Sequence, residues 1–168
     1  MDEALAKGIT SIEHAAGDPA RGLPEDIFLL ISRLTPLVNV DLLIRDDRGR
    51  TLLTWREDAY YGAGWHVPGG IIRFKETAAE RLRAVAREEL GAEADPEPAP
   101  IAFHEEIHPE RAIRGHFISL LYRCVLVGPP DAARRADGAF PAPGTWRWHD
   151  GPPDALIDVH RVYEPFLK

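Results

Sequence analysis

Apolar runs separated by short polar stretches predict most of the secondary structure of this chain. Two such runs in residues 36–56 flank the turn residues 46–49, a pattern typical of a β-hairpin. Apolar runs at 101–108 and 116–128 predict two longer strands that pair with each other. Shorter strands are predicted at 65–68, 71–74 and 145–149.

A helical period is clearest in residues 77–90. At 100° per residue, one apolar stripe that would dock on a sheet is formed by Ala79, Leu82, Ala86 and Leu90. Thr77 followed by Glu80 predicts a capping box at the start, and Gly91 predicts the end. A second helix is predicted in residues 23–34, with a proline and two acidic residues in its first turn.

The order of these elements predicts an α+β fold, with a mixed β-sheet between helices in an α/β/α sandwich. Residues 1–22 carry a weak helical pattern, and we expect them to form an N-terminal arm that contributes a dimer contact. Residues 23–168 are expected to form a single domain, since their number suits one core. Loops rich in proline, glycine or polar residues are predicted at 57–64, 94–100 and 129–144.

The charge balance narrows the kind of ligand. The chain carries a net charge of −7, which disfavours general binding to the nucleic acid backbone. No run approaches the ~18 apolar residues of a membrane span, and the acidic opening residues lack the apolar core of a secretory signal. Cys124, the single cysteine, lies in an apolar run and is expected to be a buried thiol. These features predict a cytoplasmic protein with a small-molecule ligand and neither a membrane nor a nucleic acid partner.

Two adjacent carboxylates and a preceding glycine pair make the 77–90 helix the expected place for chemistry. Glu88 and Glu89 are 100° apart on an ideal helix and straddle one flank, so both could reach one cation beside the sheet. The Gly69-Gly70 step allows close backbone approach, and a glycine carbonyl turned toward the helix would supply a third oxygen. Carboxylate, carbonyl and phosphate oxygens are ligands that Mg²⁺ prefers. The pattern therefore predicts a magnesium site.

The same segment resembles the signature of the Nudix hydrolases, G-x5-E-x7-R-E-U-x-E-E-x-G-U, where U is aliphatic. The matching positions are Gly70, Glu76, Glu88, Glu89, Gly91 and Ala92. Ala84 and Val85 stand where the family has Arg-Glu. The resemblance implies a Nudix-like sandwich that hydrolyses nucleoside-diphosphate derivatives with Mg²⁺, or with Mn²⁺ in its place. The missing glutamate implies fewer metal ions than a full multi-metal site holds.

Outside the signature, the chain is similar to the GDP-mannose mannosyl hydrolase branch of this family. The similarity covers residues 34–126 and includes the segments TPLVNVDLLIRDDRGRTLLTWR and GAGWHVPGG. It implies one Mg²⁺ ion that holds the diphosphate of a GDP-sugar, with the carbonyl of Gly69 and the carboxylate of Glu89 as ligands. It also implies that Arg56 contacts the diphosphate or the leaving group and that Asp41 lies in the site.

One catalytic position of that branch is missing. Ala142 and Pro143 stand where its members carry a Gln-His pair, a metal ligand and a general base, and neither can accept a proton. Glu76, by its signature position, and His149, directly after a predicted strand, are candidates for the catalytic base. Further candidates are His116, Glu105 and Glu106, the two acids because a distant loop acid is the base in several Nudix enzymes.

Other polar and aromatic residues complete the expected site. Arg73, with Lys75 close by, would join Arg56 in donating to the phosphates. Candidates to stack on a nucleobase are Trp55, Tyr60, Tyr61 and Trp65. His66 is expected to face outward from its short strand, and no role is assigned to His160.

Two kinds of function follow from these residues. The first is a Mg²⁺-dependent Nudix hydrolase that acts on a nucleotide sugar such as GDP-mannose. Within it, sugar release and cleavage of the pyrophosphate of this or another nucleotide are both open. The second is a sensor that binds a nucleotide sugar without turnover, motivated by Val85 and Pro143 at two expected catalytic positions.

Overall fold

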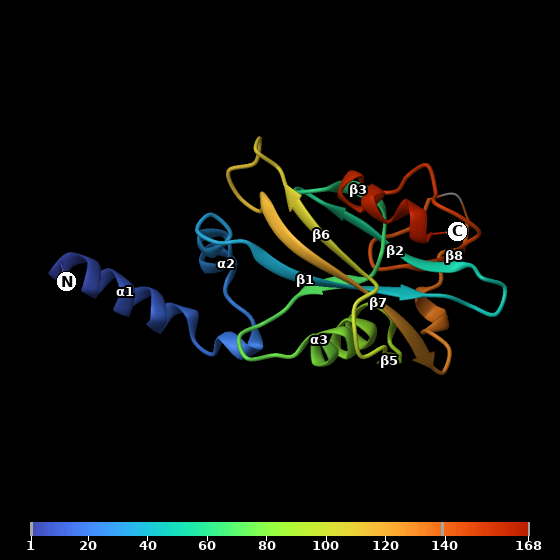
Figure 1. Ribbon diagram of the computed structural model, residues 1–168, viewed down its shortest axis with the longest axis horizontal. Helices are drawn as coiled ribbons and strands as arrows, with labels where there is room; N and C mark the ends of the chain where they lie inside the picture. Colours follow the sequence, from blue (N-terminus) through green and yellow to red (C-terminus); the bar gives the residue numbers. More distant parts are fainter. Residues whose placement is uncertain (1, 139, 168) are drawn as a thin grey trace.

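Two β-sheets form the body of the protein, and an N-terminal helix projects from it (Figure 1). The structure, a computed structural model, describes residues 2–138 and 140–167. The α-helices are α1 (Glu3–Ala16), α2 (Glu25–Ile31) and α3 (Ala78–Val85). The strands are β1 (Leu37–Ile44), β2 (Thr51–Asp58), β3 (Gly62–His66), β4 (Gly69–Ile71), β5 (Glu93–Pro96), β6 (Ala102–Ile107), β7 (His116–Val127) and β8 (Trp146–His149). Short 3₁₀ helices lie at Pro19–Arg21, Ala132–Arg134 and Asp158–Phe166, and a π-helical turn at Ala86–Leu90.

The larger sheet is mixed, as predicted. Its order is β4-β1-β7-β5, and β6 also pairs with β7. β1 and β7 run parallel, whereas the pairs β1–β4, β5–β7 and β6–β7 are antiparallel. The smaller sheet is antiparallel and has the order β3-β2-β8. The expected α+β class with a mixed sheet is confirmed.

The core has two parts, one on each face of the larger sheet. On one face, Leu82, Ala86 and Leu90 pack against Val40 and Leu42 of β1, and all five side chains are fully buried. The second face of the larger sheet meets the smaller sheet and the C-terminal 3₁₀ segment (Figure 1). The cover on this second face therefore combines the smaller sheet with the C-terminal segment and its 3₁₀ helix.

The predicted hairpin in residues 36–56 is wrong, although both of its strands exist. β1 and β2 belong to different sheets and share one isolated bridge, between Arg45 and Thr51. Both edges of β1 are already paired, with β4 and with β7, so β2 turns away and pairs with β3 and β8. Because β2 pairs with β3, the loop expected at 57–64 is shortened to a tight turn between these two strands.

The helix that carries the two glutamates begins as predicted. The Thr77 hydroxyl accepts a hydrogen bond from the Glu80 N–H, and the Glu80 carboxylate accepts one from the Thr77 N–H at 2.8 Å. Gly91 ends the element in the left-handed region with φ 63°. The π-helical turn at 86–90 was not predicted, and it changes the directions of the side chains after Val85.

The remaining predictions divide between confirmed and corrected. The β6–β7 pair is confirmed, and Cys124 is buried with 4% exposure. The loop predicted at 94–100 is partly wrong, because its first three residues, up to Pro96, belong to β5 and pair with β7. Met1, Ala139 and Lys168, which the expected arm, loop and domain include, lie outside the described residues. No helix in the described ranges has the length and apolar character needed to cross a membrane.

Candidate active site

A cleft of roughly 150 Å³ opens between the two sheets and the C-terminal segment. The face of β1 that carries Asp41 forms its floor, and the β2–β3 strands, β4 and β7 form its sides. The residues that carry the argument below are Asp41, Arg56, Tyr61, Gly69, Glu106 and His160. Residues that are distant in sequence therefore meet in one hollow.

Asp41 is 1% exposed and lies at the floor of this cleft. Its Oδ2 accepts hydrogen bonds from the Tyr163 hydroxyl at 2.6 Å and the Asn39 amide at 2.8 Å, while Oδ1 has no partner among the described residues. Burial raises the pKa of Asp41 to about 8, although both hydrogen bonds act to lower it, and the carboxylates of Glu106 and Glu89 add to the rise. Asp41 is therefore largely protonated at neutral pH, and its buried Oδ1 packs against Gly69.

Glu89 lies where the helix meets the Gly69-Gly70 bend. Its Oε1 accepts from the Gly69 N–H at 3.2 Å, and its Oε2 accepts from the Thr54 hydroxyl at 2.7 Å and lies 3.3 Å from His66 Nε2. Burial acts to raise the pKa of Glu89, but the hydrogen bonds from His66, Thr54 and Gly69 outweigh it and hold that pKa below its ordinary value. Glu89 is therefore ionised at neutral pH, and Oε1 keeps an unused lone pair.

Glu88, the other predicted ligand, points elsewhere. Its side chain is 56% exposed, against 25% for Glu89. Its Oε2 accepts a hydrogen bond at 2.8 Å from Arg81, whose own side chain is 4% exposed. Glu88 thus compensates a buried guanidinium beneath Gly70, and the two glutamates occupy different surroundings.

The oxygen donors fit a Mg²⁺ ion that shares its ligands with a substrate. Within residues 2–138 and 140–167, no group of three or more His, Cys, Asp or Glu side chains is placed to hold a metal ion. Mg²⁺ commonly takes one or two carboxylates and fills its other positions with water and phosphate oxygens. The ionised Glu89 beside the glycine bend meets that need, whereas Val85, at the position of a signature glutamate, is an apolar residue with 2% exposure.

Arg56 lies in the cleft, two residues beyond Thr54 on β2. Its Nε donates to Asp58 Oδ2 at 2.6 Å, and its guanidinium carbon is 4.6 Å from the centroid of the Tyr61 ring. The ion pair and the ring fix the direction of the side chain, so its remaining N–H groups can face a phosphate.

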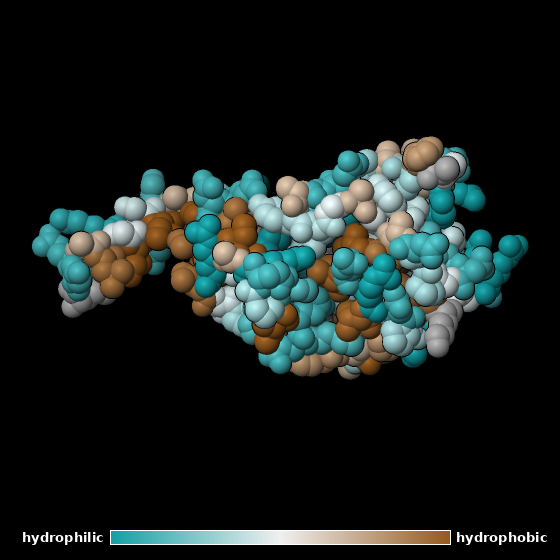
Figure 2. Space-filling view, turned by 90° about the horizontal axis from the view of Figure 1, so that it is seen from above, coloured by the Kyte–Doolittle hydropathy of each residue, from teal (hydrophilic) through white to brown (hydrophobic). Residues whose placement is uncertain are grey.

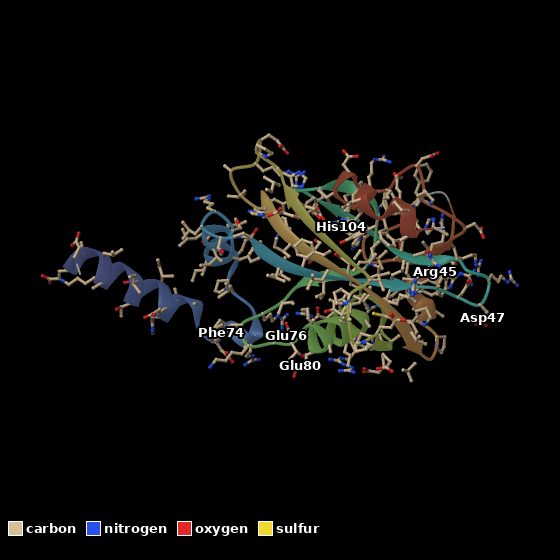
Figure 3. The ribbon with its side chains drawn as sticks, viewed as in Figure 1. Arg45, Asp47, Phe74, Glu76, Glu80 and His104 are labelled. Atoms are coloured by element: carbon tan, nitrogen blue, oxygen red, sulfur yellow. The ribbon has the colours of Figure 1, made fainter. Side chains whose placement is uncertain are left out.

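Five predicted site residues lie outside the cleft lining: Glu88 and Glu89, which meet it only through neighbouring residues such as Gly69, and Glu76, Arg73 and His149. Glu76 and Arg73 belong to the loop that enters α3, where the Glu76 carboxylate accepts from the Arg73 N–H at 2.9 Å (Figure 3). Arg73 also lies 3.8 Å from Glu88. His149, on β8, packs its ring against Trp65, with centroids 4.6 Å apart. Burial and Arg147 lower the pKa of His149 to about 4.

Two histidines have positions that the sequence analysis did not foresee. The prediction that His66 faces outward is wrong, since it is 8% exposed and contacts Glu89. Alternation fails there because both faces of β3 are covered, and the adjacent Trp65 is also buried with 4% exposure. His160 is buried, and its Nδ1 accepts a hydrogen bond from the Val67 N–H at 2.9 Å. Burial lowers the pKa of His160, which keeps the ring neutral and able to accept.

Of the two acids proposed on β6, one reaches the cleft. Glu106 lines it, and burial raises the pKa of its carboxyl, against a hydrogen bond with Ser119. Glu105 points the other way along the same strand and lies 3.6 Å from His116. The signal that separates them is the two-residue period of a strand, which places alternate side chains on opposite faces.

The mixed sheet, the helix that ends in paired glutamates and the glycine bend beside a polar cleft define the class as an α+β protein with an enzyme-like cleft. The family model of the NUDIX domain matches residues 35–152, and the chain belongs to that family. The Nudix hydrolase expected from the signature is thereby confirmed.

Comparisons with individual proteins agree with this assignment. A stretch of 80 residues is 40% identical to the low-salt glycan biosynthesis protein Agl8 of Haloferax volcanii, and it covers 48% of this chain and 51% of that protein. The match therefore spans about half the length of that relative. The crystal structure of the MutT NUDIX hydrolase from Burkholderia pseudomallei is similar with a TM-score of 0.63 at 22% identity, over 80% of this chain and 99% of that one. The MutT protein from Methanosarcina mazei Go1 gives 0.58 at 19%, over 79% and 94%. At these identities the two structures support the fold alone.

Proposed function

We propose that this protein hydrolyses a nucleoside diphosphate linked to another group, with Mg²⁺ or Mn²⁺, and that its substrate is a nucleotide sugar such as GDP-mannose. The observation that carries the proposal is the ionised Glu89 held against the backbone of Gly69, a residue that lines the cleft. The partial similarity to Agl8, whose name refers to glycan biosynthesis, supports a sugar-linked substrate. The predicted cytoplasmic location stays a prediction.

The residues of the cleft have separate tasks in this proposal. Glu89 and the Gly69 carbonyl would hold the metal ion, with Glu88 close by. Once bound, the ion would neutralise negative charge on the diphosphate as its bond to the leaving group breaks. Arg56 donates to the same phosphates from the neighbouring position on β2. Asp41 would form the floor beneath the substrate, with its Oδ1 buried against Gly69.

We assign Glu106 as the candidate base for the attacking water. It lies in the cleft, and its raised pKa makes it a better proton acceptor than an exposed glutamate. The other candidates are less suitably placed, because Glu76 is engaged with the Arg73 backbone and His149 packs on Trp65. His160 lines the cleft but does not suit this role, because its Nδ1 already accepts from the Val67 N–H and the neutral ring then carries its proton on Nε2.

The products of GDP-mannose in oxygen-18 water test the reaction. Label on free mannose, with GDP as the other product, indicates attack at the sugar carbon. Label on phosphate, with GMP and mannose 1-phosphate, indicates cleavage of the pyrophosphate. Absence of turnover with Mg²⁺ and with Mn²⁺, across a panel of nucleotide sugars, would contradict the hydrolase proposal.

A non-catalytic sensor is the second candidate, and the pairing of Glu88 with buried Arg81 favours it. The ion pair occupies Glu88, one of the two adjacent signature glutamates, and Val85 stands where the signature has a further glutamate. Thermal stabilisation by a nucleotide sugar without any product would support the sensor. Turnover in the same mixture would exclude it.

We also propose that the arm forms a homodimer contact. No residue of α1 is buried, and the apolar side chains of Leu5, Ile9 and Ile12 are 57%, 41% and 40% exposed on the projecting helix (Figure 2). An isolated helix of 14 residues is marginal in water, so a second copy that covers this stripe would stabilise it. Sedimentation should show a dimer that Ile9→Asp converts to monomer, and a wild-type monomer would contradict the contact.

A further inference from the structure

Three arginines gather around one tyrosine at the end of the cleft away from Glu89. The guanidinium carbons of Arg56, Arg111 and Arg114 lie 4.6, 5.2 and 5.2 Å from the centroid of the Tyr61 ring. They come from β2 and from the 108–115 loop between β6 and β7. The sequence therefore gives no local sign that these charges converge.

Arg114 differs from the other two because no carboxylate compensates it. Arg56 is paired with Asp58, and Arg111 lies 3.6 Å from Glu110. In the described ranges, no carboxylate oxygen lies within 4.0 Å of Arg114. Four aromatic rings surround its guanidinium instead, at 4.9 to 5.8 Å, from Phe28, Tyr60, Tyr61 and Phe117. Ring faces hold a cation in place without cancelling its charge.

The backbone holds Arg114 in a conformation that a non-glycine residue seldom adopts. Its φ is 52°, in the left-handed region. Its N–H donates to the Ser32 hydroxyl at 3.2 Å, and the following Gly115 has no room for a side chain, since a Cβ there would lie 2.6 Å from the Arg111 carbonyl. Such strain persists where the surrounding structure enforces it, and here it aims a guanidinium at the cleft.

Arg114 contacts Tyr61, in the turn just after β2, and the order of groups along β2 therefore places Arg114 beyond the diphosphate. Thr54, which contacts Glu89, Arg56 and Asp58 share one face of this strand and are two residues apart. The distance from Thr54 to the end of the strand is therefore about 13 Å at 3.3 Å per residue. A diphosphate held at Glu89 and Arg56 covers the first part of that length, which leaves Arg114 beside whatever the diphosphate is linked to.

We propose that Arg114 is a specificity residue that binds a second anionic group of the substrate, a carboxylate or a phosphate, beyond the diphosphate. Arg111 adds to the positive electrostatic potential there, and the Tyr61 ring holds the three guanidinium groups close together. A nucleotide sugar with an acidic sugar, or a nucleotide with an additional phosphate, has the required charge. This inference rests on the proposed function, since it assumes that the diphosphate lies at Glu89.

Matched substrate pairs test the subsite. UDP-glucuronate and UDP-glucose differ by one carboxylate, and coenzyme A and 3′-dephospho-coenzyme A differ by one phosphate. We expect kcat/KM of the wild type to favour the anionic member of at least one pair about tenfold, the value of one charge-assisted hydrogen bond. The pair that shows the preference identifies the source of the charge. Arg114→Met should abolish it, whereas Arg123→Met, an exposed arginine on β7, should not change it.

A binding measurement separates this inference from the proposed function. The same ligands are compared by thermal stabilisation in the presence of Mg²⁺, which needs no turnover. If nothing is hydrolysed but the anionic members stabilise the wild type more and Arg114→Met loses the difference, the subsite stands and the hydrolase proposal falls. If neither pair is discriminated by rate or by binding in the wild type, the subsite is overturned, even if Arg114→Met does not fold.

Discussion

The two sides of the cleft are built in opposite ways. The acidic side, which comprises Glu89 and Asp41, is held by hydrogen bonds at 2.6 to 3.2 Å to backbone, hydroxyl and amide groups. The arginine side, which comprises Arg56, Arg111 and Arg114, gathers on the Tyr61 ring, with Arg56 and Arg111 also paired to Asp58 and Glu110. Hydrogen bonds tune protonation, and ring faces leave a permanent charge unchanged. The acidic side can therefore do proton and metal chemistry, while the arginine side can only attract and orient.

The largest effect is expected from Glu89→Gln, which removes the charge of the acidic side and nearly keeps its shape. We expect kcat with Mg²⁺ to fall about a thousandfold, or about 4 kcal/mol, because the metal site loses the charge of the ionised Glu89 carboxylate. Initial rates under saturating substrate measure this, with circular dichroism to verify the fold. Glu88→Gln is the matched control and should cost about tenfold or less, since that side chain is half exposed and serves Arg81. Equal losses in both variants would refute the distinction between the two glutamates.

Arg56→Met tests the arginine side at the point where it meets the diphosphate. We expect kcat/KM to fall about a hundredfold, or about 2.7 kcal/mol, for every diphosphate substrate, because charge-assisted contacts are lost in the transition state. Asp58→Asn keeps Arg56 but removes its ion pair, and a smaller loss of about fivefold is expected. If Asp58→Asn were as damaging as Arg56→Met, orientation rather than charge would be the contribution of this side.

Gly69→Ala tests how closely the acidic side is packed. A Cβ at Gly69 would overlap Asp41 Oδ1, so we expect the free energy of unfolding to fall by about 2–3 kcal/mol. Urea unfolding measures this. Gly8→Ala, where a Cβ meets nothing within 4 Å, should leave the body of the protein as stable as before. A neutral Gly69→Ala would mean that Asp41 moves easily and is not fixed at the floor.

The smallest effect concerns His149, which belongs to neither side. Its folded pKa of about 4 lies below the ordinary 6.5, so the unfolded chain binds a proton that the folded protein does not. The free energy of unfolding is therefore highest above pH 6.5, and it falls by about 1–3 kcal/mol as the pH falls toward 4. His149→Gln should flatten the pH profile of the free energy of unfolding between these values. If the variant instead lost most of its activity at pH 7, the sequence-based assignment of His149 as a catalytic base would regain support.

The acidic side and Arg56 could be predicted from sequence, whereas Arg111 and Arg114 could not. Glu89 belongs to one continuous signature, Gly69 directly precedes its first glycine, and the expected capping box and closing glycine both form. The arginine side is assembled from α2, the β2–β3 turn and the 108–115 loop, and no spacing along the chain links Arg114 to Tyr61. The same limit explains the false hairpin, because local turn residues do not reveal that both edges of β1 are taken by β4 and β7. The exposure of His66 was misjudged because its cover comes from Glu89, 23 positions later in the sequence.

The bond from Thr54 to Glu89 joins the smaller sheet to the helix on the larger one, and it gives the protein an internal optical reporter. Trp65 directly precedes His66, which also contacts Glu89. The centroids of the Trp65 and Trp55 rings are 5.2 Å apart. We expect a cation that draws Glu89 away from Thr54 and His66 to shift β2 and β3, the strands that also carry both indoles. Tryptophan emission during a titration with Mg²⁺ would report that shift without a label.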